Sequence, residues 1–182
     1  MKNWLEHQIE LDPGQDILEN VNVNPNQLNK YQRFTYDLIE KFNKEKKQLL
    51  MILLGTAGTG KSFTVSAITK LKEGHIKKAS PTAKAAFLIN GDTLHSLFSI
   101  PIDNSNKKTA FLDLENEALA NLQRQFDGID LLIIDEFSML GQEMFGKIDR
   151  RLKQAKNNNS PLDGISLILI GDPAQLHTIN LK

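Results

Sequence analysis

The sequence predicts an α/β fold in which a parallel sheet carries helices on both faces. Three solid apolar runs, at 49–54, 129–135 and 165–171, have the length and composition of strands. Segments with helical periodicity alternate with these runs along the chain. Strands that are apolar at every position are typical of parallel sheets, because helices cover both of their faces. Ligands of such folds bind at the carboxyl ends of the strands, so the residues just after the runs are the first candidates for a site.

Composition narrows the function classes before any motif is considered. The 182 residues are most simply one domain, with 22 basic and 22 acidic side chains. No whole-chain field therefore attracts nucleic acid or an acidic membrane, and any polyanion must be held by a local patch. The sequence has no cysteine, which excludes disulfides, thiolate zinc sites and cysteine nucleophiles. No apolar run reaches the length of a membrane span, so we expect an intracellular protein without a membrane partner.

The first predicted elements are an arm, a helix and a strand. Residues 1–27 are polar, rich in asparagine and without a lasting period, which indicates an irregular amino-terminal arm. Along 28–42 apolar residues repeat at helical spacing. These residues, expected on one face of the helix, are Tyr31, Phe34, Leu38 and Phe42. The strand at 49–54 follows, and its uninterrupted apolar run predicts that both of its faces are buried.

The remaining elements keep the alternation of strands and helices. A shorter strand is predicted at 76–80, and the segments 99–112 and 156–164 read as loops. The further predicted helices are 60–71, 82–90, 113–126 and 141–155, with one more helical turn at 93–98.

The stretch "GTAGTGKS", residues 55–62, matches the phosphate-binding loop G-x-x-x-x-G-K-[ST] between a strand and a helix. Its glycines allow the backbone amides to wrap around a polyphosphate, and the helix N-terminus adds partial positive charge. Lys61 is expected to reach the β- and γ-phosphates, and Ser62 to ligate Mg²⁺. The predicted nucleotide contacts are Gly55, Thr56, Ala57, Gly58, Thr59, Gly60, Lys61, Ser62 and Phe63. The motif therefore predicts a P-loop NTPase, without saying which reaction it performs.

Two adjacent acids, Asp135 and Glu136, end the buried strand in "LLIIDEFSML". Adjacent carboxylates are poor choices there unless a positive group faces them. Asp135 suits a Mg²⁺ ion bound through water, together with Ser62. Glu136 is placed to orient or deprotonate a water at the γ-phosphate. The pair favours hydrolysis over transfer, as in motor-type or switch-type ATPases.

Five stretches occur in an order that is more specific than the phosphate loop alone. They are "LNKYQRF", "GTAGTGKS", "SPTAKAAFLINGDTLHSLF", "LLIIDEFSML" and "LIGDPAQL". Over about residues 28 to 176 the chain resembles the first RecA-like domain of superfamily-one DNA helicases, most closely the petite-integration-frequency family related to RecD. The resemblance implies that 28–182 is an ATP-dependent DNA helicase motor domain, the first of two RecA-like domains. It also implies single-stranded DNA as a partner, the second RecA-like domain as another, and movement from 5′ to 3′ in the full-length enzyme.

The resemblance also assigns roles to individual residues. Gln32 is expected to read the adenine edge, since an amide pairs with adenine N6 and N7. Lys61 and Glu136 are the implied catalytic residues together with Gln175, which would contact the γ-phosphate or its attacking water and relay nucleotide state toward DNA, with Asp172 shaping its turn. The implied residues of a single-strand groove are Pro81, Thr82, Lys84, His95 and Ser96. For His95 packing and DNA contact stay equally open, whereas Phe98 is expected in the core rather than stacked on a base.

The chain departs from the family pattern in three respects. Ala83 stands where the family usually has a glycine, and His177 and Thr178 stand where it usually has a proline pair. As the third departure, we expect this chain to lack the family's second RecA-like domain. The arginine that completes the ATP site would come from the second domain. Alone, the chain is therefore expected to bind ATP weakly, to hydrolyse it slowly and not to unwind DNA. Arg150 and Arg151 stay open as substitutes for that arginine.

Two other functions remain compatible with these motifs. One is a nucleotide-gated binding or switch module, and the other is a different P-loop motor ATPase without unwinding activity. ATP turnover measured with and without single-stranded DNA distinguishes them from a helicase motor.

Overall fold

The computed structural model describes residues 24–102, 111–156, 160–172 and 174. Their core is a five-stranded sheet with the order β1-β5-β4-β2-β3, in which all neighbouring strands are parallel. The strands are β1 (Leu50–Leu54), β2 (Ile76–Ser80), β3 (Asp92–Thr93), β4 (Leu131–Ile134) and β5 (Ser166–Gly171). The parallel sheet confirms the predicted fold class, although the two-residue strand β3 was not predicted.

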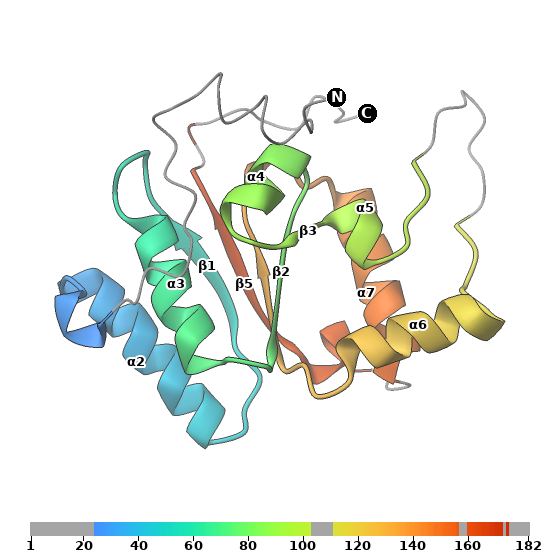
Figure 1. Cartoon of the computed structure of the whole chain (residues 1–182), viewed down its shortest axis with the longest axis horizontal. Coiled ribbons are helices and arrows are strands. Elements are labelled where there is room, and N and C mark those ends of the chain that lie inside the picture. The colour runs from blue at the N-terminus through green and yellow to red at the C-terminus, as the bar shows by residue number, and fades with distance from the viewer. Residues whose placement is uncertain (1–23, 103–110, 157–159, 173, 175–182) are drawn as a thin grey trace, which may run out of the picture.

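Helices cover both faces of the sheet (Figure 1). They are α2 (Lys30–Lys44), α3 (Lys61–Leu71), α4 (Ala83–Leu88), α5 (Leu94–Leu97), α6 (Asn116–Phe126) and α7 (Gln142–Lys156). Short 3-10 turns are η1 (Pro25–Gln27), η2 (Phe137–Met139) and η3 (Pro161–Gly164). α2 and α3 lie on one face, and α6 and α7 lie on the other (Figure 1). Each predicted helix is present, with ends that differ by a few residues.

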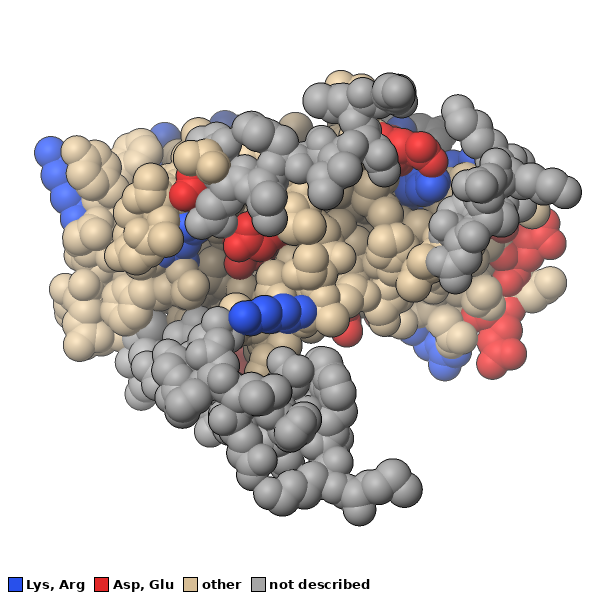
Figure 2. All heavy atoms as spheres, turned by 90° about the horizontal axis from the view of Figure 1, so that it is seen from above, with Lys and Arg blue, Asp and Glu red and all other residues tan. Residues whose placement is uncertain are grey.

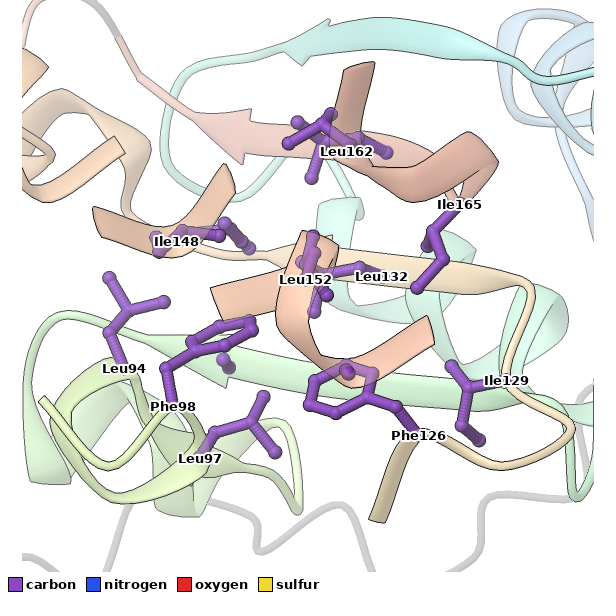
Figure 3. Packing of buried hydrophobic residues seen from close by; sticks show 14 of the residues in the cluster. Leu94, Leu97, Phe98, Phe126, Ile129, Leu132, Ile148, Leu152, Leu162 and Ile165 are labelled. Carbon is purple, nitrogen blue, oxygen red and sulfur yellow. The ribbon is translucent and has the colours of Figure 1, made fainter. Parts of the chain in front are cut away.

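The central strand β4 contributes side chains to two apolar cores, one on each face of the sheet. Leu131 and Ile133 pack with α2 and α3, whereas Leu132 and Ile134 pack with α6 and α7. All four are at most 1% exposed, as expected for a strand that is apolar at every position. In the second core the Phe98 and Phe126 rings stack at 5.4 Å (Figure 3). Phe98 is fully buried, which agrees with its expected place in the core.

The first strand corrects the prediction that both of its faces are buried. Met51 and Leu53 pack with α2 and α3, but Leu50, Ile52 and Leu54 are each 57% exposed. The reason is position, because β1 is an edge strand of the described sheet. On that face the described helices pack over β2, β4 and β5. A solid apolar run alone does not distinguish an edge strand from a central one.

The prediction that α2 buries its apolar face is wrong near the start of the helix. Tyr31 and Phe34 are 81% and 68% exposed, whereas Thr35 and Ile39 are buried. Further along the helix, Leu38 and Phe42 pack against the core as expected. The first turn of α2 instead contacts the phosphate loop, where Gln32 Nε2 donates to Gly60 O at 3.3 Å.

The predicted arm, residues 1–27, lies mostly outside the described residues. Its last residues form η1, where Asn24 Oδ1 accepts from Asn26 N at 3.0 Å and caps the turn. Among the described helices, none has the length and apolar character to cross a membrane.

Candidate functional site

The parallel sheet brings the ends of its strands to one edge. Gly55 N, just after β1, donates to Gly171 O at the end of β5 over 3.3 Å. Asp135 N, just after β4, donates to Ala79 O in β2 over 2.9 Å. The phosphate loop, the acidic pair and the end of β5 therefore meet, although Gly55 and Gly171 are 116 residues apart in the sequence.

The phosphate loop has the backbone that its glycines predict. Gly58 and Gly60 have φ values of +76° and +81°, in the left-handed region that favours glycine. A Cβ atom on Gly60 would also lie 2.4 Å from Gln32 Nε2. Gly60 is the N-cap of α3 and offers no side chain there. The loop is thus held open toward solvent at the amino terminus of a helix, where backbone amides attract anions.

Lys61 folds back over this loop. Its Nζ donates to Gly55 O at 2.7 Å and to Thr56 O at 3.0 Å. Burial raises the pKa values of Asp135 and Glu136, and the positive charge of Lys61 partly offsets this effect by lowering them. The ammonium therefore lies between the loop and the acidic pair.

A cavity of about 240 Å³ joins the two motifs. Its lining residues are Ala57, Gly58, Lys61, Ser62, Val65, Ala85, Leu88, Ile89, Asp135, Glu136 and Ile170. Five of the predicted nucleotide contacts are not among them: Gly55, Thr56, Thr59, Gly60 and Phe63. A larger cavity of about 340 Å³ lies at the other end of the strands, near Lys72 and Asp130. There the buried Lys72 Nζ is paired with Asp130 at 2.6 Å, which is a structural ion pair.

Both residues of the acidic pair are partly buried, and Glu136 also has a strained backbone. Burial raises the pKa of Asp135, against a hydrogen bond from Glu136 N to its Oδ1 at 2.9 Å and the charge of Lys61. Burial also raises the pKa of Glu136, and the charges of Asp135 and Asp172 add to this effect. Glu136 has φ 55° and ψ 41°, a left-handed conformation that costs free energy in a residue other than glycine. A carboxylate with a raised pKa is a stronger base, which suits proton abstraction.

The donors near the loop fit a hard divalent cation that is held mainly by a nucleotide. Ser62 and Asp135 contribute hydroxyl and carboxylate oxygens to the same cavity. Within the described part of the chain, no group of three or more metal-binding side chains forms. Mg²⁺ usually takes one or two protein ligands and completes its shell with phosphates and water.

Gln32 lies at the phosphate loop, but both polar atoms of its amide are engaged. Oε1 accepts from Asn29 N at 2.9 Å in a capping box at the start of α2. Nε2 donates to Gly60 O at 3.3 Å. Oε1 keeps a second lone pair and Nε2 keeps a second proton, so these bonds leave the amide able to contact an adenine edge, and the predicted role of Gln32 remains a prediction.

The residues predicted for a single-strand groove gather on α4 and α5. Thr82 caps α4 by accepting from Ala85 N at 3.3 Å, and Pro81 precedes it. Lys84 and Ser96 are exposed, whereas His95 is half-buried on α5. The two helices follow β2 and β3, which pair side by side at the sheet edge. Figure 2 views the molecule from above, onto the carboxyl ends of the strands, where basic and acidic side chains both reach the surface.

Arg150 and Arg151, the possible substitutes for the arginine of the second domain, make structural contacts and do not line the cavity. Arg151 is 2% exposed and donates to Phe98 O at 3.1 Å and to Leu112 O at 2.9 Å. Its guanidinium lies 4.1 Å from the centre of the Phe111 ring. Arg150 pairs with Asp113 at 2.6 Å. Charge alone did not reveal that Arg151 is buried, because the carbonyl groups it meets belong to distant segments.

The end of β5 is described only in part. Gln175 lies outside the described residues, so its predicted contact stays a prediction. Asp172 is 5% exposed, and its Oδ1 accepts from Ala174 N at 2.9 Å, as expected for a residue that shapes this turn. The sequence did not predict that Phe137 would pack on Gly171, although a glycine that ends a buried strand is a signal of close packing.

Comparison with known proteins agrees with this arrangement. The family model described as PIF1-like helicase matches residues 27–182. ATP-dependent DNA helicase Pif1 of Campylobacter jejuni is 34% identical over 144 residues, which cover 74% of this chain and 31% of that protein. ATP-dependent DNA helicase PIF1 of Saccharomyces cerevisiae is 30% identical over 131 residues, which cover 69% of this chain and 15% of that protein.

A solved structure is similar over most of the chain. Pif1 helicase from Bacteroides, in complex with ADP-AlF3 and single-stranded DNA, has a TM-score of 0.69 and 28% sequence identity. The similarity covers 85% of this chain and 34% of that one. The chain thus spans less than a third of the length of the two curated relatives above. On the family match over 27–182, the chain belongs to the PIF1-like helicase family.

Proposed function

We propose that this chain is the ATP-binding motor domain of a DNA helicase, acting in an intracellular compartment that holds DNA. The observation that carries the proposal is one cavity lined by Lys61, Ser62, Asp135 and Glu136. Family membership supports it, and relatives in that family are named ATP-dependent DNA helicases.

The phosphate loop and Lys61 bind the triphosphate of ATP in this proposal. The open amides of the loop meet the phosphate oxygens. Lys61 Nζ exchanges its bonds to Gly55 O and Thr56 O for phosphate oxygens. Ser62 and Asp135 would hold a Mg²⁺ ion, which supplies neutralising charge on the phosphates when it is bound. Gln32 contacts the adenine edge with the amide proton and the oxygen lone pair that its bonds to Gly60 O and Asn29 N leave available.

Glu136 accepts the proton of the water that attacks the γ-phosphate. Its raised pKa keeps the carboxylate basic, while the nearby Lys61 charge favours the ionised form that the reaction needs. Gln175 senses the γ-phosphate or the attacking water and passes nucleotide state toward DNA.

Single-stranded DNA crosses the surface of α4 and α5, where hydroxyls, backbone amides and Lys84 hold phosphates without reading sequence. A second RecA-like domain supplies the arginine that this chain lacks at the cavity. Such an arginine contributes about 10³ to 10⁵ in rate in related phosphoryl-transfer enzymes. The four arginines of the sequence all lie in the described helices, and Arg33 and Arg124 pair with Asp37 and Asn121.

The test compares ATP binding and ADP formation, with and without a single-stranded oligonucleotide, in the wild-type chain and in Glu136→Gln. Slow wild-type turnover that rises with DNA, together with intact binding and lost turnover in Glu136→Gln, is expected. Turnover that DNA does not change would favour another motor ATPase. Binding without turnover in the wild type would favour a switch module, and wild-type turnover in Glu136→Gln would remove Glu136 as the base.

A further inference from the structure

The residue after the acidic pair, Phe137, packs directly on the end of β5. A Cβ atom on Gly171 would lie 2.9 Å from Phe137 Cδ1 and 3.2 Å from Cε1. It would also lie 3.4 Å from Phe137 N. Gly171 is not among the glycines with positive φ, so its backbone permits alanine. The Phe137 ring is therefore the nearest obstacle to a side chain at Gly171.

The turn that Phe137 begins carries a strained residue. Glu136 is left-handed, and η2 continues with Met139 N bonded to Glu136 O at 3.1 Å and Leu140 N to Phe137 O at 2.8 Å. A left-handed glutamate persists only where its surroundings fix it, since the conformation itself is unfavourable. The packing of Phe137 on Gly171 is the tertiary contact next to this turn.

Gly171 also contacts the phosphate loop. Its carbonyl accepts from Gly55 N, the first residue of the phosphate loop, at 3.3 Å. Asp172 follows it and lies close enough for its charge to act on Glu136. One glycine thus contacts the start of the phosphate loop and the turn of the acidic pair.

We propose that Gly171 is a positioning residue for Glu136. Its missing side chain lets the Phe137 ring lie on the end of β5, and this contact fixes the turn that aims the Glu136 carboxylate into the cavity. The role rests on the proposed ATP hydrolysis, because Glu136 is the base of that reaction. Neither Gly171 nor Phe137 lines the cavity of about 240 Å³, so we expect neither to contact the nucleotide.

The first test is a double-mutant cycle on ATP hydrolysis by the 182-residue chain. Gly171→Ala is expected to lower kcat by about tenfold or more, with KM for ATP changed by less than about threefold, because small displacements of a catalytic group are costly. Phe137→Ala removes the ring and is expected to lower kcat by about fivefold or more, again without loss of nucleotide affinity. The double variant should match Phe137→Ala within about twofold, since the clash is gone.

Two outcomes of this cycle overturn the proposal. One is a Phe137→Ala variant whose kcat stays within about twofold of the wild type. The other is a Gly171→Ala loss of the same size in both backgrounds, which means that the added methyl group acts elsewhere. Because Phe137→Ala only removes atoms, it decides the question even if Gly171→Ala alone does not fold.

Gly146→Ala is the matched control. Gly146 is exposed in α7 and lacks a positive φ, and a Cβ atom added to it would have no neighbour within 4 Å. Alanine there is expected to leave kcat unchanged and to raise Tm slightly, because alanine favours a helix more than glycine does.

A second readout does not need turnover. In ¹H–¹⁵N spectra, Gly171→Ala should shift the amide resonances of Glu136, Phe137 and Met139, whereas Gly146→Ala should leave them in place. Unshifted resonances in Gly171→Ala overturn the positioning role. If the wild-type chain shows no hydrolysis above Glu136→Gln, the proposed function fails on its own terms, and the spectra still decide the role of Gly171.

Discussion

Gln32 Nε2 donates to Gly60 O at 3.3 Å and so ties the first turn of α2 to the amino terminus of α3. The same amide caps α2 through Asn29 N. A ligand that contacts this amide therefore acts on the phosphate loop and on the start of α2 together.

Gln32→Ala is expected to weaken ATP binding by about tenfold and to reduce the preference for ATP over GTP, because the loss of a paired amide costs about 1–3 kcal/mol of base discrimination. Competition between labelled ATP and unlabelled GTP measures both effects. Gln125→Ala, at an exposed position of α6, is the control. An unchanged ATP preference in Gln32→Ala would exclude adenine recognition by this residue.

Glu136 should make stability depend on pH. Its pKa is raised by burial and by neighbouring carboxylates, so the folded state binds its proton more tightly than the unfolded chain does. The stabilising effect is full below the ordinary glutamate value of 4.5 and is lost as pH rises through the raised pKa. Glu136→Gln carries no charge at any pH and is expected to have a higher Tm than the wild type at neutral pH.

Thermal unfolding measured across this pH range tests whether Glu136 lowers stability as pH rises. The Tm advantage of Glu136→Gln should shrink as pH falls toward the ordinary glutamate value. Glu117→Gln, at an exposed position of α6, should show no such trend. An advantage that is constant with pH would mean that repacking, rather than charge, explains it.

Lys84 should contribute charge to single-strand binding. It is exposed on α4, beside the Thr82 cap. Log affinity falls as log salt rises, and the steepness of this fall depends on the number of phosphate contacts. Lys84→Ala is expected to make the negative slope shallower by about 0.7, the value for one phosphate contact on a single strand. Fluorescence anisotropy with an oligonucleotide at several salt concentrations measures the slope. Lys44→Ala, at the other end of α2 from the phosphate loop, should leave it unchanged, and an equal effect of both variants would point to nonspecific attraction.

Arg151 should be among the most important polar side chains for stability. Its truncation leaves Phe98 O and Leu112 O without their charged donor in a buried site. Arg151→Ala is expected to lower the free energy of unfolding by about 3 kcal/mol, whereas the exposed Arg150→Ala should cost less than about 1 kcal/mol. Urea denaturation of both variants gives the comparison. Equal losses would show that burial of Arg151 does not set its contribution.

Removing the hydroxyl group of Ser80 should stabilise the folded protein. Ser80 is fully buried at the end of β2, and its Oγ has no hydrogen-bond partner among the described residues. Ser80→Ala is expected to raise the free energy of unfolding by about 1 kcal/mol, because an unpaired buried hydroxyl is costly. Ser96→Ala, on the exposed side of α5, serves as the control in the same denaturation experiment. Destabilisation by Ser80→Ala would reveal a partner for this hydroxyl.

The sequence by itself determined the features whose cause is local. The glycines of the phosphate loop mark left-handed backbone, which Gly58 and Gly60 adopt. The uniform apolar run of β4 predicts a strand with two buried faces, and both are buried. Parallel strands carry their ends to one edge, so the motifs alone predict one site for Lys61 and Asp135, which line the same cavity. In each case neighbouring residues encode the backbone or the burial directly.

Only the tertiary structure decided what each surface meets. The apolar residues of β1 are similar to those of β4, yet the position of β1 at the edge of the described sheet leaves Ile52 exposed. Arg151 is buried because carbonyl groups from distant segments converge on it. The contact of Phe137 with Gly171 exists because β4 and β5 lie side by side. These features depend on distances between residues far apart in the chain, which no local pattern records.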